Sequence, residues 1–255
     1  MIPRNTEYMK PAIPKGPAIV FRPQGYAAEA SATFSGMFDL SEFLHPGAPQ
    51  EIERCVIPRA HWNILRMPIK RPCSDYRIPM ALSSLEPIVR LVADAEAKIS
   101  ADHDRAHCHI TLERQFVLSG ETQRMPGFHV DGFQRLKHGH YTEVEHSYIV
   151  SDVYPTEFSI RGYDLSWVEN WRHMFRVMDA EVPISSVVVA EPNKIYRMTC
   201  YQVHRTPRLP RNTWRSFLRV TYAMRELEDP RNTVNPCFDG QVYGSWSGDI
   251  RNILV

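Results

Sequence analysis

The sequence predicts a mainly β protein with flanking helices, on three observations. Short stretches that alternate polar and apolar residues recur between residues 107 and 223, with turn residues between them. Twenty prolines are scattered along the chain and leave little room for long helices. Helical periodicity is confined to two segments. Many short strands joined by local turns favour a sandwich or a barrel over an alternating sheet of parallel strands and helices.

Length and composition indicate a single globular domain over residues 1–255. Of these 255 residues 43% are hydrophobic, and no apolar run approaches the ~18 residues that a membrane span needs. Because 30 Lys and Arg nearly balance 29 Asp and Glu, we expect a small-molecule substrate rather than nucleic acid or a membrane surface. The five cysteines form no CxxC pair and the N-terminus has no apolar signal region, so we expect a cytoplasmic protein. A homo-oligomer is compatible with the sequence, but no sequence feature supports one.

The N-terminal flanking region, residues 1–105, is expected to contain extended segments, turns and one helix. Eleven prolines fall within residues 1–80. The helix is predicted over residues 84–100, where Ser83 and Glu86 have the spacing of a capping box, and it should pack on the outside of a sheet. Its apolar stripe consists of Ile88, Val89, Leu91, Val92, Ala95 and Ile99.

The β core is expected over residues 106–226, followed by a C-terminal tail over residues 227–255. Strands are predicted at residues 107–118, 146–152, 156–161, 184–190, 195–203 and 214–223. One helix, over residues 166–179, interrupts the strand series. Its apolar face consists of Val168, Trp171, Phe175 and Met178.

The segment Phe128-His129-Val130-Asp131-Gly132 carries the first part of a candidate metal site. On an extended chain, residues two apart point to the same side, so His129 and Asp131 can present an imidazole and a carboxylate to one point. His204 is the candidate third ligand from another strand. Two histidines and one carboxylate on one face of an octahedral iron leave three positions open for other ligands.

A second feature follows His204. The predicted strand over residues 214–223 places Arg215, Phe217, Arg219 and Thr221 on one side. Burying two guanidinium groups inside a barrel is costly unless anions meet them. A dicarboxylate supplies such anions, and the planar fork of arginine matches a carboxylate.

The HxD motif, the distal histidine, and arginines 11 and 15 positions after it together resemble the iron(II)/2-oxoglutarate-dependent oxygenases. The form Arg-x-x-x-Arg-Val-Thr is nearest to the taurine dioxygenase branch. The resemblance implies a double-stranded β-helix, a jelly-roll or cupin-like barrel. It also implies iron(II) ligation by His129, Asp131 and His204, and a salt bridge from the distal carboxylate of 2-oxoglutarate to Arg215. Arg219 would then lie nearer the metal or the substrate.

The same resemblance implies that Thr156 lies beside the cosubstrate carboxylate. The implied reaction consumes dioxygen and 2-oxoglutarate and oxidises an unactivated C–H bond of a small molecule. Halogenating members of the family lack the motif carboxylate, so Asp131 predicts a hydroxylase rather than a halogenase.

Two other interpretations remain open. Residues Gly132, His138, His140 and Glu145 resemble the first metal motif of the cupins, which would make the protein a cupin-like metal-binding isomerase or binding protein. No second cupin motif follows. Alternatively, the protein is a non-catalytic β-barrel in which the HxD motif is accidental.

Overall fold

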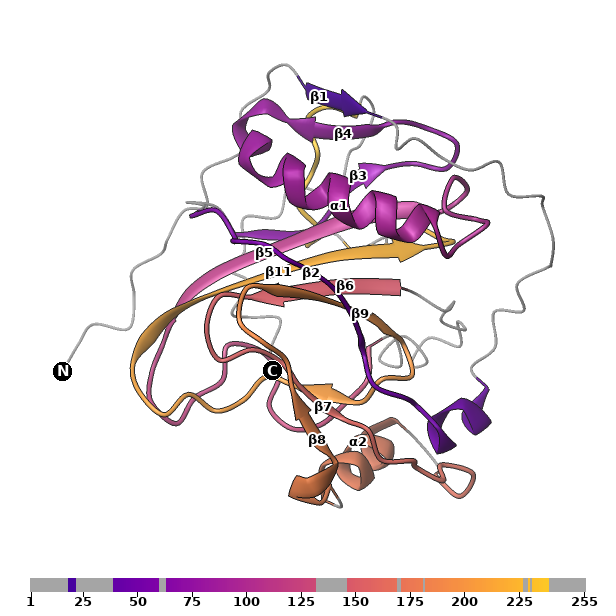
Figure 1. The fold of residues 1–255 in the computed structure, drawn as a ribbon, viewed down its shortest axis with the longest axis vertical. Coiled ribbons are helices and arrows are strands. Elements are labelled where there is room, and N and C mark those ends of the chain that lie inside the picture. The colour runs from indigo at the N-terminus through magenta and orange to yellow at the C-terminus, as the bar shows by residue number, and fades with distance from the viewer. Residues whose placement is uncertain are drawn as a thin grey trace.

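The fold consists of three layers, with a large antiparallel sheet in the middle (Figure 1). The computed structural model describes residues 18–21, 39–59, 63–131, 146–168, 171–180, 182–226, 229 and 231–238. A helix and a two-stranded ribbon cover one face of the large sheet, and a three-stranded sheet with a second helix lies on the opposite side. The candidate site lies between the two larger sheets.

The large sheet has six strands in the order β2-β9-β6-β11-β5-β3. The two central strands pair without a break over eleven residue pairs, from Thr213↔Val117 to Ala223↔His107. The strands are β2 (Gln50–Arg54), β3 (Ile64–Lys70), β5 (His107–Val117), β6 (His146–Ser151), β9 (Lys194–Thr199) and β11 (Thr213–Ala223).

Alternation along β11 sends its two sets of side chains into different environments. Leu218, Val220 and Tyr222 join the main apolar core, which helix α1 (Glu86–Ala97) covers. Phe217, on the other side of the strand, packs with Phe158 of the small sheet. The face that carries Phe217 is called the inner face below.

The ribbon and short helices complete the first layer. Strand β1 (Ala18–Phe21) pairs with β4 (Tyr76–Pro79), and β4 contributes Tyr76 and Ile78 to the main core. Two 3₁₀ helices, η1 (Leu40–Leu44) and η2 (Met80–Leu85), precede β2 and α1.

The small sheet has the order β10-β7-β8, formed by β10 (His204–Arg205), β7 (Glu157–Ser159) and β8 (Val187–Val189). A 3₁₀ turn, η4 (Ile184–Ser186), leads into β8. Helix α2 (Trp171–Ala180) places Met174 and Met178 in a second apolar cluster with Phe128 and Val203. This cluster supports the small sheet from the side opposite to the large one.

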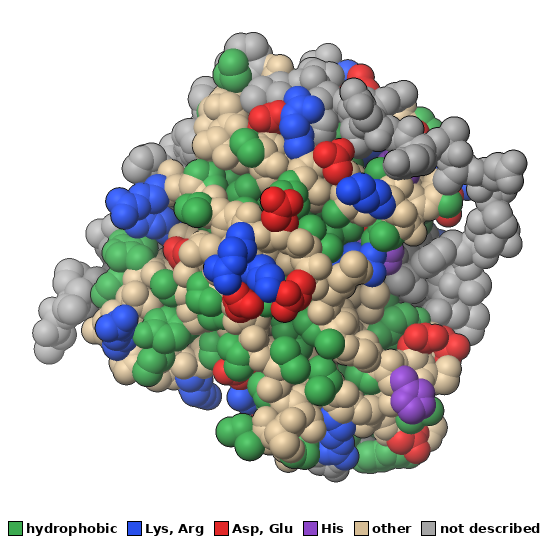
Figure 2. All heavy atoms as spheres, in the orientation of Figure 1, with side chains coloured by type: hydrophobic (Ala, Val, Ile, Leu, Met, Phe, Trp, Pro, Cys, Tyr) green, Lys and Arg blue, Asp and Glu red, His purple; other side chains and the backbone are tan. Residues whose placement is uncertain are grey.

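Charged side chains mark the exposed edge of the large sheet at β2 and β9. Lys194 forms ion pairs with Glu51 and Glu191, and Arg54 also pairs with Glu191. Figure 2 shows basic and acidic side chains interspersed with apolar ones on this face of the molecule. Charges on an edge strand discourage pairing with another chain.

The mainly β prediction is confirmed, whereas a closed barrel is not formed by the described residues, whose strands belong to separate sheets. The double-stranded β-helix therefore stays a prediction. All six predicted strands have counterparts in the structure. Both predicted helices are present but shorter, and α1 begins after a 3₁₀ turn in which Ser83 makes no capping bond. None of the described helices is long and apolar enough to cross a membrane.

Candidate functional site

Two paired chain segments bring the candidate histidines together. The backbones of His129 and His204 exchange two hydrogen bonds, with N···O distances of 3.0 and 2.9 Å, so residue 129 extends the small sheet beside β10. Residues that exchange both bonds lie directly opposite each other with their side chains on the same face. The two imidazole rings are accordingly only 4.8 Å apart between centroids.

Each histidine is oriented through the ring nitrogen nearer its backbone. Nδ1 of His129 lies 2.8 Å from the carbonyl oxygen of Gly127, and Nδ1 of His204 lies 2.9 Å from that of Gln202. A carbonyl oxygen only accepts, so each Nδ1 donates its hydrogen. The neutral rings therefore keep a lone pair on Nε2, the tautomer typical of metal-binding histidines.

The carboxylate of Asp131 lies beside the same rings. Its Oδ2 is 3.6 Å from Nε2 of His204 and forms an ion pair with Nη1 of Arg219. Burial acts to raise the pKa of Asp131, but Arg219, His204 and His129 together hold it well below its usual range. The carboxylate is thus ionised at neutral pH and available as an anionic ligand.

Burial and the neighbouring His204 lower the pKa of His129 to about 4, and burial also lowers the pKa of His204. Both rings are therefore neutral at pH 7, the form that binds a metal. The side chains fit a two-histidine, one-carboxylate metal site in chemical type. Among the described residues, however, no three His, Cys, Asp or Glu side chains are grouped as a metal site. Asp131 is instead directed toward Arg219.

The inner face of the large sheet contains the predicted arginines. Arg215 is fully buried and Arg219 is 7% exposed, which confirms that this side of the strand points inward. Thr221, on the same face, shares a 3.1 Å hydrogen bond with Ser147. Polar and ionic groups are therefore buried between the sheets, where a purely structural interface would be apolar.

The guanidinium of Arg215 is bound by the protein itself. Its Nε donates to the carbonyl oxygens of Val153 and Tyr154 at 3.2 and 3.0 Å. Nη2 donates to Ser151 Oγ at 2.8 Å, and Nη1 donates to the side chain of Gln123. Burial lowers the pKa of Arg215 to about 10, which still leaves it charged at neutral pH. The predicted cosubstrate anchor thus also fastens β6, β11 and the 123 segment together.

Thr156 is buried next to β7, as a residue inside the fold should be. Its backbone carbonyl accepts a hydrogen bond from Ala190. The hydroxyl that contacts Arg215 is that of Ser151 instead. The alternative metal residues Gly132, His138, His140 and Glu145 lie outside the described residues.

Sequence reasoning missed Arg124, which the structure places at the same site. Its Nη1 lies 3.0 Å from Glu113 on β5, and its guanidinium stacks 4.8 Å above the ring of Phe217. Arg124 follows a turn and belongs to no strand, so no alternation pattern could assign it to the inner face. The only signal was the neighbouring Gln123, a polar residue that proves to be buried.

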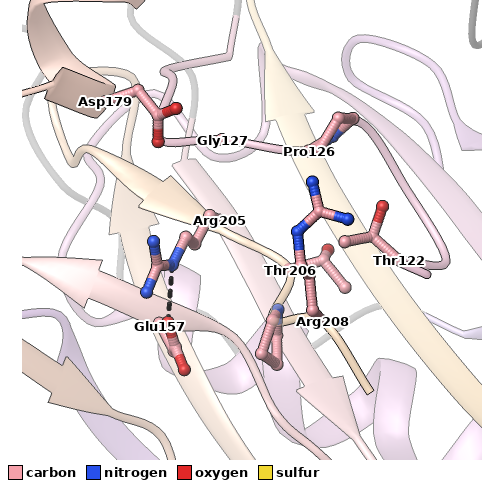
Figure 3. A pocket seen from close by; sticks show the side chains of 9 residues that line it. Thr122, Pro126, Gly127, Glu157, Asp179, Arg205, Thr206 and Arg208 are labelled. Carbon is pink, nitrogen blue, oxygen red and sulfur yellow. Dashed lines mark hydrogen bonds and ion pairs between the residues drawn. The ribbon is translucent and has the colours of Figure 1, made fainter. Parts of the chain in front are cut away.

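A cavity of about 500 Å³ lies at the end of the paired histidine segments (Figure 3). Arg205 and Glu157, which form a 2.6 Å ion pair, line one side, and Thr122, Pro126 and Gly127 line another. His204 pairs with Phe158 on one face of the small sheet, so the alternating pair Arg205 and Glu157 belongs to the opposite face. The cavity therefore lies beside the histidine face and not upon it.

No family model matches the chain, and no curated protein matches it. Two solved structures show weak similarity. An oxidoreductase of the 2OG-Fe(II) oxygenase family from Burkholderia pseudomallei has 11% identity and a TM-score of 0.35, covering 73% of this chain and 78% of that one. AviO1 from Streptomyces viridochromogenes Tue57 has 14% identity and a TM-score of 0.35, covering 79% and 98%. At these values the similarity establishes neither the fold nor the activity of this chain.

Proposed function

We propose that the protein is an iron(II)- and 2-oxoglutarate-dependent dioxygenase that oxidises a C–H bond of a small molecule. One observation carries the proposal: two paired histidines, each held through Nδ1 by a backbone carbonyl, lie with an ionised carboxylate at one point. In this account His129, Asp131 and His204 hold the metal. Iron with 2-oxoglutarate and dioxygen would supply the oxidant for the C–H bond.

The chain's own groups prepare the metal site in defined ways. The carbonyls of Gly127 and Gln202 fix both rings with Nε2 free, so little reorganisation is required when a cation arrives. Arg219 keeps Asp131 ionised and holds it near His204. Binding a cation requires Asp131 to turn partly away from Arg219, which leaves a guanidinium beside the metal that can meet an anion.

The charges between the sheets favour a dianionic cosubstrate. Arg124 pairs with Glu113, Arg219 pairs with Asp131, and Asp152 is the acidic neighbour that raises the pKa of Arg215 against the effect of burial. These three cations and three carboxylates balance. A bound divalent cation would add two positive charges, which the two carboxylates of 2-oxoglutarate would neutralise.

Asp131 also bears on the reaction type. With this carboxylate on the metal, 2-oxoglutarate would take two of the three remaining positions and dioxygen the third. No position then remains for a halide. We therefore propose hydroxylation, or a desaturation or ring closure that begins with the same hydrogen abstraction, and not halogenation.

The proposal is tested by anaerobic reconstitution with iron(II) and 2-oxoglutarate, followed by visible absorption of the metal-to-ligand charge-transfer band. Wild-type protein should form the band, and His129→Ala and His204→Ala should each lose it. His103→Ala is the matched control, because Nδ1 of His103 also meets a backbone carbonyl, that of Ser100, at 2.9 Å. If His138→Ala or His140→Ala lost the metal while His129→Ala kept it, the cupin-like alternative would replace this proposal.

A further inference from the structure

We propose that Arg124 binds the distal carboxylate of the dicarboxylate cosubstrate, an assignment that rests on the proposed function and names a residue outside the HxD–His–Arg pattern. Three features of the inner face lead to it: the position of Arg124 between the two arginines of β11, its incomplete hydrogen bonding, and the prior commitments of Arg215 and Arg219.

Position comes first. Phe217 lies midway between Arg215 and Arg219 on β11, two residues or roughly 7 Å along the strand from each. The guanidinium carbon of Arg124 is 4.8 Å from the centre of that ring. Because Arg219 contacts Asp131, the metal end of the inner face is at Arg219. Arg124 is therefore displaced from the metal end toward Arg215, as an anchor for the far end of a bound diacid must be.

The hydrogen bonding of Arg124 is incomplete. Its Nη1 is buried and has no hydrogen-bond acceptor, because the 3.0 Å ion pair with Glu113 is not aligned as a hydrogen bond. Nε of Arg219 is likewise buried without an acceptor. A buried N–H of a cation that lacks an acceptor is unfavourable, and a carboxylate is the ligand group that satisfies it best. Two such groups on one inner face indicate an anion between the sheets.

The arginines of β11 are less suited to the distal carboxylate. Arg215 has no exposed surface and donates to Gln123, Ser151 and two backbone carbonyls, so a ligand would have to displace these partners. Arg219 is held at the metal end by Asp131. The side chain of Arg124 is 22% exposed, so it can be reached without breaking the sheet.

The backbone of Arg124 is also fixed. Thr122 Oγ1 donates to the carbonyl of Arg124 at 2.6 Å, and the adjacent Gln123 is tied to Arg215 and to the carbonyl of Glu113. Figure 3 shows that Thr122, Pro126 and Gly127 of the same loop line the neighbouring cavity. The loop thus faces solvent on one side and presents Arg124 to the site on the other.

The experiment measures the Kd of 2-oxoglutarate by anaerobic titration of the charge-transfer band in iron(II)-loaded protein. Arg124→Gln should raise this Kd about 30-fold or more, the lower range for loss of a charge-assisted pair, because the guanidinium is partly exposed. Pyruvate, a 2-oxo acid without the distal carboxylate, should bind Arg124→Gln and wild type equally. Iron(II) affinity should also be unchanged, and Arg124→Lys should recover part of the 2-oxoglutarate affinity.

Arg114→Gln is the matched control. Arg114 stacks 4.9 Å from Trp214 of the same strand, but on the opposite face of the sheet. It should therefore leave the Kd of 2-oxoglutarate within twofold of wild type. The same Kd for Arg124→Gln and wild type would overturn the assignment of Arg124, while leaving the dioxygenase proposal standing if the band forms.

A metal-free arm separates the two failures. Succinate should bind the metal-free wild type and bind Arg124→Gln more weakly, as measured by titration calorimetry, with matching melting temperatures showing that both are folded. If wild type formed no chelate band but bound succinate through Arg124, the anion site would stand and the dioxygenase would fall. If wild type bound neither 2-oxoglutarate nor succinate, both proposals would be wrong.

Discussion

Substituting Gly127 by alanine should weaken both the fold and the metal site, because this residue performs two tasks at once. Its backbone is left-handed, with φ of 81°, and its carbonyl oxygen fixes the ring of His129. A Cβ at this position would lie 3.1 Å from the carboxyl group of Asp179. That carboxyl accepts a 2.9 Å hydrogen bond from the backbone N–H of Phe128.

The magnitude follows from these contacts and from a matched control. Gly120 has a nearly identical φ of 82°, but an added Cβ there would meet nothing within 4 Å. Gly120→Ala should therefore cost only the backbone strain, about 1–2 kcal/mol. Gly127→Ala should cost about 1.5 kcal/mol more, for displacement of the exposed Asp179 from its bond to Phe128. For a chain of this size that difference lowers Tm by about 3–6 °C.

The assay pairs thermal unfolding with iron(II) titration. Because the carbonyl that orients His129 belongs to the strained residue, Gly127→Ala should weaken iron(II) binding about 10–100-fold, and Gly120→Ala should leave it unchanged. Equal Tm values and equal iron affinities for the two variants would refute the link between the Gly127 turn and His129.

Three further outcomes are expected. Arg215→Met should destabilise the fold by about 3–5 kcal/mol in equilibrium unfolding, because it strands the acceptors Gln123 and Ser151 and two carbonyls, whereas an effect below about 1 kcal/mol would show that the network is not structural. Since burial and His204 lower the pKa of His129 to about 4, below the unfolded value of about 6.5, the unfolded chain takes up the extra proton; metal-free wild type should lose stability from pH 6.5 toward 4, and His129→Gln should lose less. With a native substrate, labelled dioxygen should appear in a hydroxylated product in the presence of chloride, and a chlorinated product detected by mass spectrometry would contradict the role given to Asp131.

The strands of the core were predictable because their side chains obey a simple period. On β11 the alternation correctly placed Arg215 and Arg219 inside, since burial on both faces leaves only one register. Helix α2 was predicted too early because Ser166 donates to Asp164 in a local turn instead of capping the helix. Such side-chain competition is not visible in apolar periodicity.

The N-terminal strands and Arg124 lay beyond sequence reasoning for different reasons. Strand β3 contains Pro68, which a strand at the edge of a sheet tolerates but which obscures its pattern. Arg124 reaches the site through a turn whose position depends on long-range contacts of Gln123 with Arg215. Spacing found the three candidate ligands because HxD geometry is local, whereas the surrounding charges are assembled by the fold.

The most direct test of the metal assignment is an anomalous-difference map from a crystal grown anaerobically with iron(II). We expect a single strong peak bonded to Nε2 of His129, Nε2 of His204 and a carboxylate oxygen of Asp131, with Nδ1 of both rings still on the carbonyls of Gly127 and Gln202. A peak at His138, His140 and Glu145, or no iron peak at the paired histidines, would contradict the account.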